Sequence, residues 1–192
     1  LSMVPEQLDP SQKYGDLFIG VDIGRFKDQT CIWVLERGFD KEAPPHLRDV
    51  YRTVAVKLVQ NMTFEAQYQL ISQYLTLPNV IKCNVDRSGL GLQLAEQLVS
   101  EYGNLVEGVA ISAPEKQGLV ERTLKYISQE RVSLPKDPDI KSDIICMRRI
   151  VTQKGNISYD GRSNIGHGDC FIALAMALRG ADKTANFSMS TA

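Results

Sequence analysis

The chain has 192 residues, of which 43% are hydrophobic and 23% are charged, close to the averages for a soluble globular protein. This length suits one domain, and the composition excludes a disordered, collagen-like or disulfide-scaffold protein. The 22 lysines and arginines and the 23 aspartates and glutamates give a formal net charge of −1. Any nucleic-acid surface must therefore be a local patch, because no overall positive field attracts a polyanion.

The first third of the chain has the hydrophobic pattern of β-strands. Continuous or alternating apolar residues predict strands over 17–24, 29–37 and 51–59. The second strand is expected to return antiparallel to the first, and the third follows a loop. Residues 1–16 are expected to form a tether ahead of this sheet.

The pattern then switches between helices and further strands. Apolar residues at three- and four-residue spacing predict helices that begin near residues 63, 92 and 117, and a last helix over 169–179. Strands are expected over 80–86 and 106–111, and a hairpin over 150–159. Three antiparallel strands followed by strand–helix crossovers predict a mixed α/β sheet covered by helices on both faces. The polar residues 181–192 are expected to form a flexible tail.

The sequence has no features of a membrane or secreted protein. Its longest apolar run, Cys170–Leu178, is shorter than the roughly 20 residues that cross a bilayer. The amino-terminal LSMVPEQLDP lacks the basic and then apolar pattern of a signal peptide. The four cysteines stand far apart without a C-x-x-C pair, which fits a reduced cytoplasm.

Three aspartates lie at the ends of segments that are expected to be buried. Asp22 interrupts the apolar strand FIGVDIG, where a charge is costly unless it is paired or ligated. Asp86 ends the strand VIKCNVD, and Asp169 opens the last helix. Each also fits a purely structural role, respectively a strand-end turn, an Asx turn and a helix N-cap.

The three positions together favour a metal site. The strands that end in Asp22 and Asp86 are expected to be neighbours, so that their carboxylates meet at one edge of the sheet. A cluster of carboxylates with no other neutralising group favours hard divalent cations with oxygen ligands, Mg²⁺ or Mn²⁺. Two-metal hydrolysis of phosphodiesters requires such a cluster.

Three sequence motifs resemble the nuclease domain of the large terminase subunit of tailed phages, in particular Mu-like phages and prophages. They are GVDIGRFKDQT around Asp22, CNVDRSGLGLQLAEQL around Asp86 and NIGHGDCFIALAMALRG around Asp169. The hairpin segment KGNISYDGRSN also resembles that family. The resemblance covers nearly all of residues 17–180, which we take as one domain, and implies a ribonuclease-H-like fold with an added hairpin before the last helix.

The resemblance also implies an activity and its catalytic residues. It implies a metal-dependent endonuclease that cuts concatemeric double-stranded phage DNA in the host bacterial cytoplasm. Asp22, Asp86 and Asp169 match the metal-binding aspartates, with Asp22 bridging two Mg²⁺ or Mn²⁺ ions and the others each holding one. His167 is expected either to contact a metal-bound water or the scissile phosphate, or to serve only as a hydrogen-bonding loop residue. Many terminases carry a second acid where this chain has Gly168.

The resemblance implies partners outside this chain. The sequence has no G-x-x-x-x-G-K-[ST] phosphate loop, whereas a large terminase has an ATPase domain ahead of its nuclease. The chain, which does not begin with methionine, is therefore expected to be the carboxy-terminal half of such a protein. The small terminase subunit and the portal or prohead are further expected partners, and a membrane is not.

Candidate DNA contacts come from a locally basic stretch. Residues 116–154 contain nine basic and five acidic side chains, an excess of four positive charges. The candidates for DNA binding, including two residues beside Asp86, are Arg87, Ser88, Lys116, Arg122 and Lys154. For each of them an ordinary solvated surface position is an equally good interpretation.

Three other interpretations remain open from the sequence. One is another ribonuclease-H-like nuclease, such as a Holliday-junction resolvase or an integrase-like enzyme. Another follows from Asp22-x-Gly24 with Thr30, which resembles the phosphate-binding hairpin of the actin and sugar-kinase group, although that group needs a duplicated fold. The third is a non-catalytic adaptor in which the aspartates serve only as caps.

Overall fold

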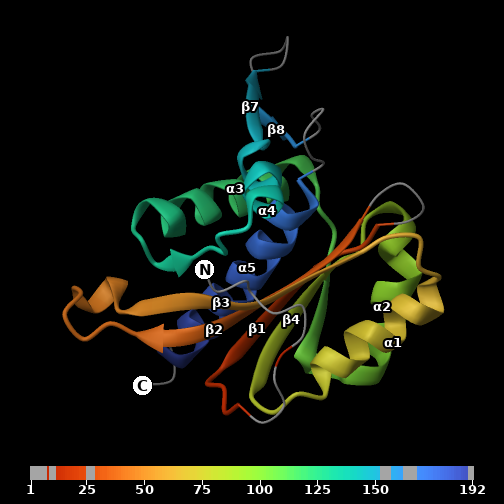
Figure 1. Ribbon diagram of the computed structural model, residues 1–192, viewed down its shortest axis with the longest axis horizontal. Coiled ribbons are helices and arrows are strands. Elements are labelled where there is room, and N and C mark those ends of the chain that lie inside the picture. The colour runs from red at the N-terminus through yellow and green to blue at the C-terminus, as the bar shows by residue number, and fades with distance from the viewer. Residues whose placement is uncertain (1–7, 9–11, 25–28, 152–156, 162–167, 190–192) are drawn as a thin grey trace.

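The computed structural model describes residues 8, 12–24, 29–151, 157–161 and 168–189. Figure 1 shows a twisted sheet between two groups of helices. The strands are β1 (Leu17–Asp22), β2 (Thr30–Phe39), β3 (Asp49–Val59), β4 (Val80–Asp86), β5 (Val106–Val109), β6 (Val132–Ser133), β7 (Arg148–Val151) and β8 (Ile157–Asp160). The α-helices are α1 (Phe64–Leu75), α2 (Leu92–Tyr102), α3 (Ala113–Ser128), α4 (Pro138–Ile145) and α5 (Asp169–Met189). In the described ranges, no helix is both long and apolar enough to cross a membrane.

The larger sheet has the order β5-β4-β1-β2-β3-β6. Strands β1, β2 and β3 pair antiparallel, whereas β4 is parallel to β1 and β5 is parallel to β4. The predicted mixed sheet is therefore confirmed. The edge strand β6 is not predicted, because its two residues are too few to show a pattern. The expected hairpin is present as β7 and β8, and its expected turn at 154–156 lies outside the described residues.

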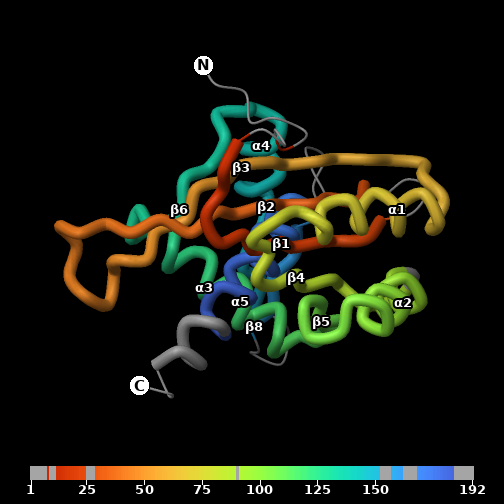
Figure 2. The backbone as a smooth tube through the Cα atoms, turned by 90° about the horizontal axis from the view of Figure 1, so that it is seen from below, coloured from red at the N-terminus to blue at the C-terminus, as the bar shows by residue number. Residues whose placement is uncertain are grey.

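Alternation along β1 assigns its side chains to two separate cores. Leu17, Ile19 and Val21 are fully buried in the core that α1 and α2 cover. Phe18 is fully buried in the core that α3, α4 and α5 cover. Figures 1 and 2 show these two groups of helices on opposite sides of the sheet. Asp22 is four residues after Phe18, so its side chain lies on the same face of the sheet, which α5 covers.

Helix α5 crosses β1 with backbone against backbone at Gly20. A Cβ atom at this position would lie 1.9 Å from the carbonyl oxygen of Ala173 and 2.5 Å from the nitrogen of Ala177. Asn84 of β4 adds a hydrogen bond from its Nδ2 to the carbonyl oxygen of Met176, at 2.8 Å. Only a residue without a side chain at position 20 allows this approach, so glycine fixes the distance between the helix and the strand.

Helix α5 extends beyond its predicted end at residue 179. Asp182 accepts a hydrogen bond from Nε of Arg122 in α3 at 2.7 Å, and Lys183 donates to Oε1 of Glu107 in β5 at 2.8 Å. These contacts hold the added turns against the domain. Residues 181–189 are thus helical, whereas the sequence predicts that they form part of a flexible tail.

The described part of the expected amino-terminal tether packs against the sheet. Asp16 forms an ion pair with Arg37 of β2. The backbone nitrogen of Gly15 donates a hydrogen bond to Oε1 of Glu36 at 2.7 Å. Residues 15 and 16 are thus attached to β2, the antiparallel neighbour of β1.

Helix α4 is short, and its hydrophobic pattern does not reveal it. Only Ile140 and Ile144 are buried. Its start does have a sequence signal, because Asp137 caps the helix and Pro138 follows at the first helical position. The Asp137 carboxylate accepts hydrogen bonds from the nitrogens of Asp139 and Ile140, at 2.8 and 3.1 Å.

The contact between β1 and α5 predicts that Gly20→Ala is strongly destabilising. The added methyl group meets backbone atoms that cannot move without displacing the helix, so we expect the free energy of unfolding to fall by more than about 3 kcal/mol. Gly118→Ala is the matched control, because a Cβ atom there meets nothing within 4 Å. That substitution, in the middle of α3, is expected to raise stability by roughly 0.5–1 kcal/mol. Urea denaturation measures both, and equal stability of the two variants would contradict the close contact.

Candidate active site

Asp22 and Asp86 lie side by side at one end of the sheet. They end the parallel strands β1 and β4, in which Val21 pairs with Val85 in register. Asn84, two residues before Asp86, faces α5 and bonds to it, so alternation places Asp86 on the same face as Asp22. The expected meeting of these two aspartates at one sheet edge is confirmed by this register.

Asp169 reaches this end of the sheet as the first residue of α5. The residue before it, Gly168, has φ of +80°, a conformation that side chains other than glycine rarely adopt. A Cβ atom at this position would also lie 3.2 Å from both the Cα of Gly161 and the Cε of Met147. The tight turn at Gly168 thus allows α5 to start directly beside the ends of β1 and β4.

The carboxylates influence one another electrostatically. Burial raises the pKa of the Asp22 carboxyl well above its ordinary value. The negative charges of Asp169, Asp86 and Asp143 raise this pKa further. The positive charge of Lys116, in the first turn of α3, lowers it. Four carboxylates and one ammonium group therefore act on the same small region.

Asp143, on α4, is a member of this group that sequence reasoning missed. Its Oδ1 accepts a hydrogen bond from the nitrogen of Gly168 at 2.8 Å, and its Oδ2 accepts one from the nitrogen of Cys170 at 2.7 Å. The sequence contains no signal for this contact, because Asp143 and Gly168 are 25 positions apart in the chain.

A buried polar network holds the chain directly after Asp22. The nitrogen of Gly24 donates to Oγ1 of Thr30 at 2.9 Å, and the Thr30 hydroxyl donates to Oε1 of Gln67 at 2.8 Å. Nε2 of Gln67 donates to the carbonyl oxygens of Gly24 and Met62, at 3.1 and 3.2 Å. Because the Thr30 hydroxyl is buried in this network, it does not fit the phosphate-binding role that the actin-like interpretation requires.

Asp86 also takes part in the turn that follows β4. Its Oδ1 accepts a hydrogen bond from the nitrogen of Ser88 at 2.8 Å, which is the Asx turn anticipated as its structural role. The Oγ atom of Ser88 accepts one from the nitrogen of Ile111 at 3.0 Å. A Cβ atom at Gly91 would lie 2.7 Å from the carbonyl oxygen of Asp86, so a glycine lets the chain turn closely here. These contacts fix the orientation of the Asp86 side chain.

The structure brings together some of the expected DNA contacts and separates others. Lys116 and Arg87 lie near the carboxylates, the first within electrostatic reach of Asp22 and the second exposed directly after Asp86. Arg122 is held in an ion pair with Asp182. Two further expected residues, His167 and Lys154, lie outside the described residues.

The donor atoms at this site fit a hard divalent cation. Carboxylate oxygens are the ligands that Mg²⁺ and Mn²⁺ prefer, and Lys116 alone does not cancel the repulsion that raises the pKa of Asp22. Within the part of the chain that the structure describes, no three side chains of His, Cys, Asp or Glu are already arranged to hold a metal ion. The carboxylates are therefore neighbours whose mutual repulsion a cation would relieve.

The Cys31 thiol beside this site does not offer alternative chemistry. Cys31 pairs with Asp22 across β1 and β2. Burial, a hydrogen bond with Cys170 and the nearby charge of Asp22 raise the pKa of the Cys31 thiol well above its ordinary value. A protonated thiol is neither a nucleophile nor a good metal ligand, so the carboxylates determine the chemistry of the site.

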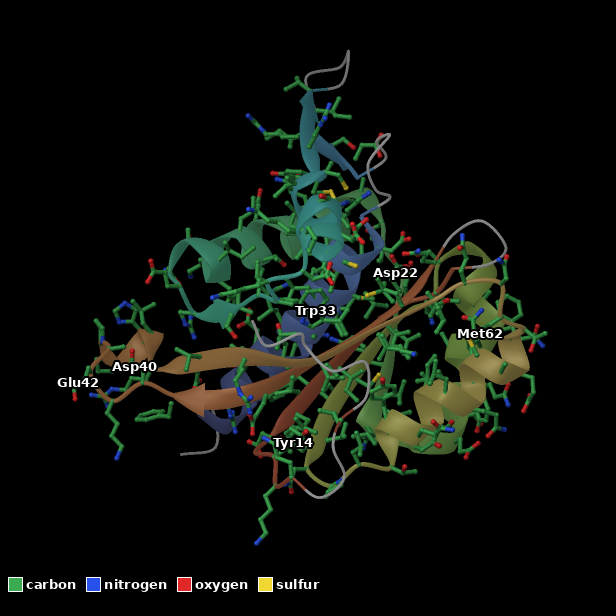
Figure 3. All side chains as sticks on the ribbon, viewed as in Figure 1. Tyr14, Asp22, Trp33, Asp40, Glu42 and Met62 are labelled. Atoms are coloured by element: carbon green, nitrogen blue, oxygen red, sulfur yellow. The ribbon has the colours of Figure 1, made fainter. Side chains whose placement is uncertain are left out.

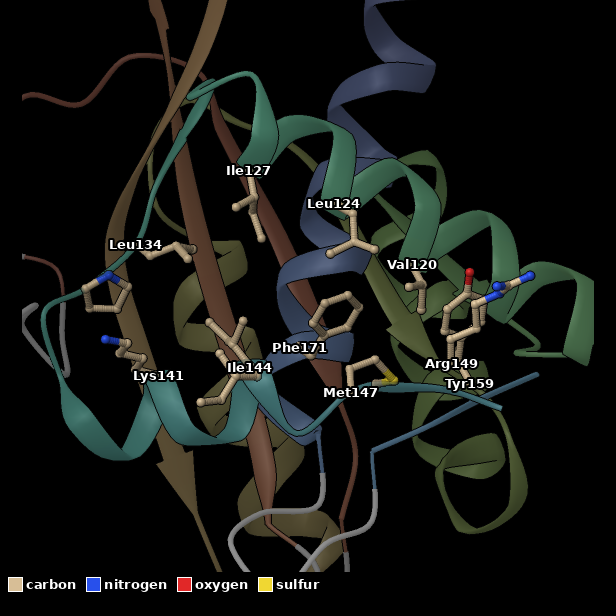
Figure 4. A pocket seen from close by; sticks show the side chains of 12 residues that line it. Val120, Leu124, Ile127, Leu134, Lys141, Ile144, Met147, Arg149, Tyr159 and Phe171 are labelled. Carbon is tan, nitrogen blue, oxygen red and sulfur yellow. The ribbon is translucent and has the colours of Figure 1, made fainter. Parts of the chain in front are cut away.

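A cavity of about 650 Å³ lies elsewhere in the domain. Figure 4 shows its mainly apolar lining between α3 and α4, with Leu124, Ile144 and Phe171 on its walls and Lys141 and Arg149 beside them. Of the described residues that line it, none carries a carboxylate. The candidate active site is therefore the end of the sheet near Asp22, seen in Figure 3, and not this cavity.

The comparisons with known proteins agree on one family and one fold. The family model described as "Terminase RNaseH-like domain" matches residues 19–180. The large terminase nuclease from thermophilic phage G20c with bound magnesium superposes with a TM-score of 0.72 at 21% identity, over 92% of this chain and 85% of that one. The HK97 bacteriophage large terminase gives 0.64 at 11% identity, over 92% of this chain and 41% of that one.

A third solved structure is similar over nearly its whole length. The nuclease domain of the bacteriophage SPP1 large terminase with bound Mn gives a TM-score of 0.57 at 13% identity, over 93% of this chain and 98% of that one. The comparison with curated proteins finds no match. At these identities the likeness to solved structures shows the fold, and the expected ribonuclease-H-like fold is confirmed.

The repulsion at Asp22 predicts that Asp22→Asn stabilises the metal-free domain. Because the pKa of Asp22 is raised by folding, its ionisation costs stability as the pH rises from the unfolded pKa, about 3.9, through the folded one. At pH 7 in EDTA we expect the substitution to raise the free energy of unfolding by about 1 kcal/mol. Below about pH 3, where the carboxyl is largely protonated in both states, the difference is expected to vanish.

Urea denaturation at several pH values measures this effect. Glu96→Gln, on the exposed face of α2, is the control for removal of one negative charge and is expected to change stability by less than about 0.5 kcal/mol. A loss of stability on Asp22→Asn at pH 7 would contradict the repulsive cluster.

Proposed function

The chain belongs to the terminase RNaseH-like domain family, and on this premise we propose that it is a metal-dependent endonuclease that cuts double-stranded DNA during phage genome packaging. The observation that supports this most strongly is that Asp22, Asp86 and Asp169 come together from two parallel strands and a helix. The charges of Asp86 and Asp169 both act on Asp22. The substrate is concatemeric phage DNA, and the bond that is hydrolysed is a phosphodiester.

The three aspartates are the proposed metal ligands. Asp22, on which the charges of both others act, would be the ligand shared by two ions of Mg²⁺ or Mn²⁺, and Asp86 and Asp169 would each hold one. Bound metal would lower the pKa of an attacking water and stabilise the leaving 3′ oxygen. The G20c nuclease with bound magnesium and the SPP1 nuclease domain with bound Mn support a divalent metal of this kind.

The protein's own contribution is to fix the ligands before DNA binds. The nitrogen of Ser88 holds one oxygen of Asp86 in place. The contact of Gly20 with α5 sets the distance of Asp169 from β1. With the backbone at Asp86 and Asp169 held in this way, metal binding would require movement of the side chains and no large change of the backbone.

DNA is proposed to approach over the start of α3. Lys116 is the primary candidate for a phosphate contact at the cleavage site, because its charge already acts on Asp22. Arg87 is exposed beside Asp86 and is the second. Ser88 and Arg122 are weaker candidates, since each is engaged in a contact within the protein. His167 and Lys154 are kept as proposed contacts from the sequence motifs.

The domain is proposed to work within a larger machine in the host cytoplasm. The match covers 41% of the HK97 large terminase, which supports the proposal that this domain is part of a longer protein, and the family resemblance implies an ATPase domain ahead of it. The small terminase subunit and the portal or prohead are the other proposed partners.

Cleavage of supercoiled plasmid tests the proposed activity. We expect nicked and linear products in Mn²⁺ or Mg²⁺ and none in EDTA. Asp86→Asn keeps an oxygen for the Ser88 nitrogen but removes a charged ligand. Its cleavage rate is expected to fall by more than the roughly 10–100-fold that loss of an outer-shell partner causes.

Asp40→Asn is the matched control for this substitution. Oδ1 of Asp40 likewise accepts a hydrogen bond from a nitrogen two residues later, that of Glu42, at 3.0 Å. Figure 3 shows Asp40 at the opposite end of the sheet from Asp22. Cleavage by Asp40→Asn is expected to equal that of the wild type, with circular dichroism confirming that both variants fold. Cleavage that persists in EDTA, or that survives Asp86→Asn, would refute the proposal.

A further inference from the structure

We propose that Asp143 is a positioning residue of the active site, which holds the first turn of α5 so that Asp169 is directed at the metal site. The inference rests on the proposed function. Asp143 lies on α4, outside the three motifs that carry the family resemblance, and acts on Asp169 through the backbone on either side of it.

The two oxygens of Asp143 bind both neighbours of Asp169. One accepts from the nitrogen of Gly168 at 2.8 Å and the other from the nitrogen of Cys170 at 2.7 Å. Two hydrogen bonds to one carboxylate fix both the position of this turn and its rotation about the helix axis. The negative charge also stabilises the amino terminus of α5.

This arrangement replaces the usual local cap of a helix. A helix normally receives its cap from the residue just before it, but Gly168 has no side chain, and its φ of +80° disfavours one. A side chain from another helix supplies the cap instead. Asp143 thus supplies capping contacts of the kind that the sequence suggested for Asp169.

Helix α4 is firmly supported on both sides of Asp143. Ile140 and Ile144 are each 8% exposed and belong to the core beneath α5. Just after the helix, the thiol of Cys146 donates to the carbonyl oxygen of Gly161 at 2.8 Å. A carboxylate held on such a support can define the position of α5.

The position of Asp143 also places its charge within reach of the metal site. The charge acts on Asp22, although Asp143 stands on a different element from the other three aspartates. An outer-shell carboxylate that orients a metal ligand is typically worth 10–100-fold in metal affinity or activity.

Calorimetric titration with Mn²⁺ tests this role. Asp143→Asn keeps the size of the side chain but presents an amide group to one of the two N–H donors. We expect its affinity for Mn²⁺ to fall by about tenfold or more. The Mn²⁺ concentration that gives half-maximal plasmid cleavage is expected to rise in parallel.

Asp137→Asn is the matched control on the same helix. Asp137 is also a capping aspartate, but it caps α4 itself. Its substitution removes the same charge and is expected to leave the affinity for Mn²⁺ unchanged. Urea denaturation in EDTA records the stability of both variants, so that a loss of metal affinity is separated from a loss of folding.

The outcomes distinguish this inference from the proposed function. Wild-type affinity for Mn²⁺ in a folded Asp143→Asn variant would overturn the positioning role and leave the proposed function standing. Failure of the wild-type protein to bind Mn²⁺ would overturn both. If Asp143→Asn does not fold, Asp143→Glu takes its place, because it keeps both oxygens and displaces them by one methylene. Weaker Mn²⁺ binding by that variant supports the inference, and unchanged binding overturns it.

Discussion

The backbone contact between Gly20 and helix α5 determines the geometry on which the rest of the site depends. A Cβ atom at position 20 would lie only 1.9 Å from the Ala173 carbonyl oxygen, so no residue other than glycine allows the helix to lie where it does. This contact sets α5 directly on the strand that ends in Asp22, two residues further along. The start of α5 then brings Asp169 to the same end of the sheet. A packing constraint in the core thus becomes a constraint on the distance between charges.

Bringing these charges together costs electrostatic free energy. Some contacts in the fold reduce this repulsion, and the repulsion that remains favours binding of a cation. Lys116 opposes the repulsion at Asp22, and the two N–H groups beside Asp169 bind Asp143. The remaining repulsion favours binding of a cation, which is the property that a metal-dependent nuclease needs. Stability of the empty domain and affinity for metal are therefore expected to be opposed at Asp22.

The parts of this structure that follow from local pattern are the parts that the sequence predicts well. The strands that end in Asp22 and Asp86 are apolar runs with a charged end, and their parallel pairing follows from the crossover through α1. The contacts that the sequence does not reveal join polar residues far apart in the chain. Asp143 and Gln67 look like ordinary helix-surface residues until the fold brings them to Gly168 and Gly24. The same reason explains the added turns of α5, in which Asp182 and Lys183 bond to residues of α3 and β5.

Anomalous diffraction from crystals grown with Mn²⁺ tests most directly that the end of the sheet is a metal site created by the approach of α5. The predicted result is an anomalous peak bound by Asp22 together with Asp86 or Asp169, and no such peak in crystals of Asp22→Asn. Manganese bound only at other residues, or a peak that persists in crystals of Asp22→Asn, would contradict it.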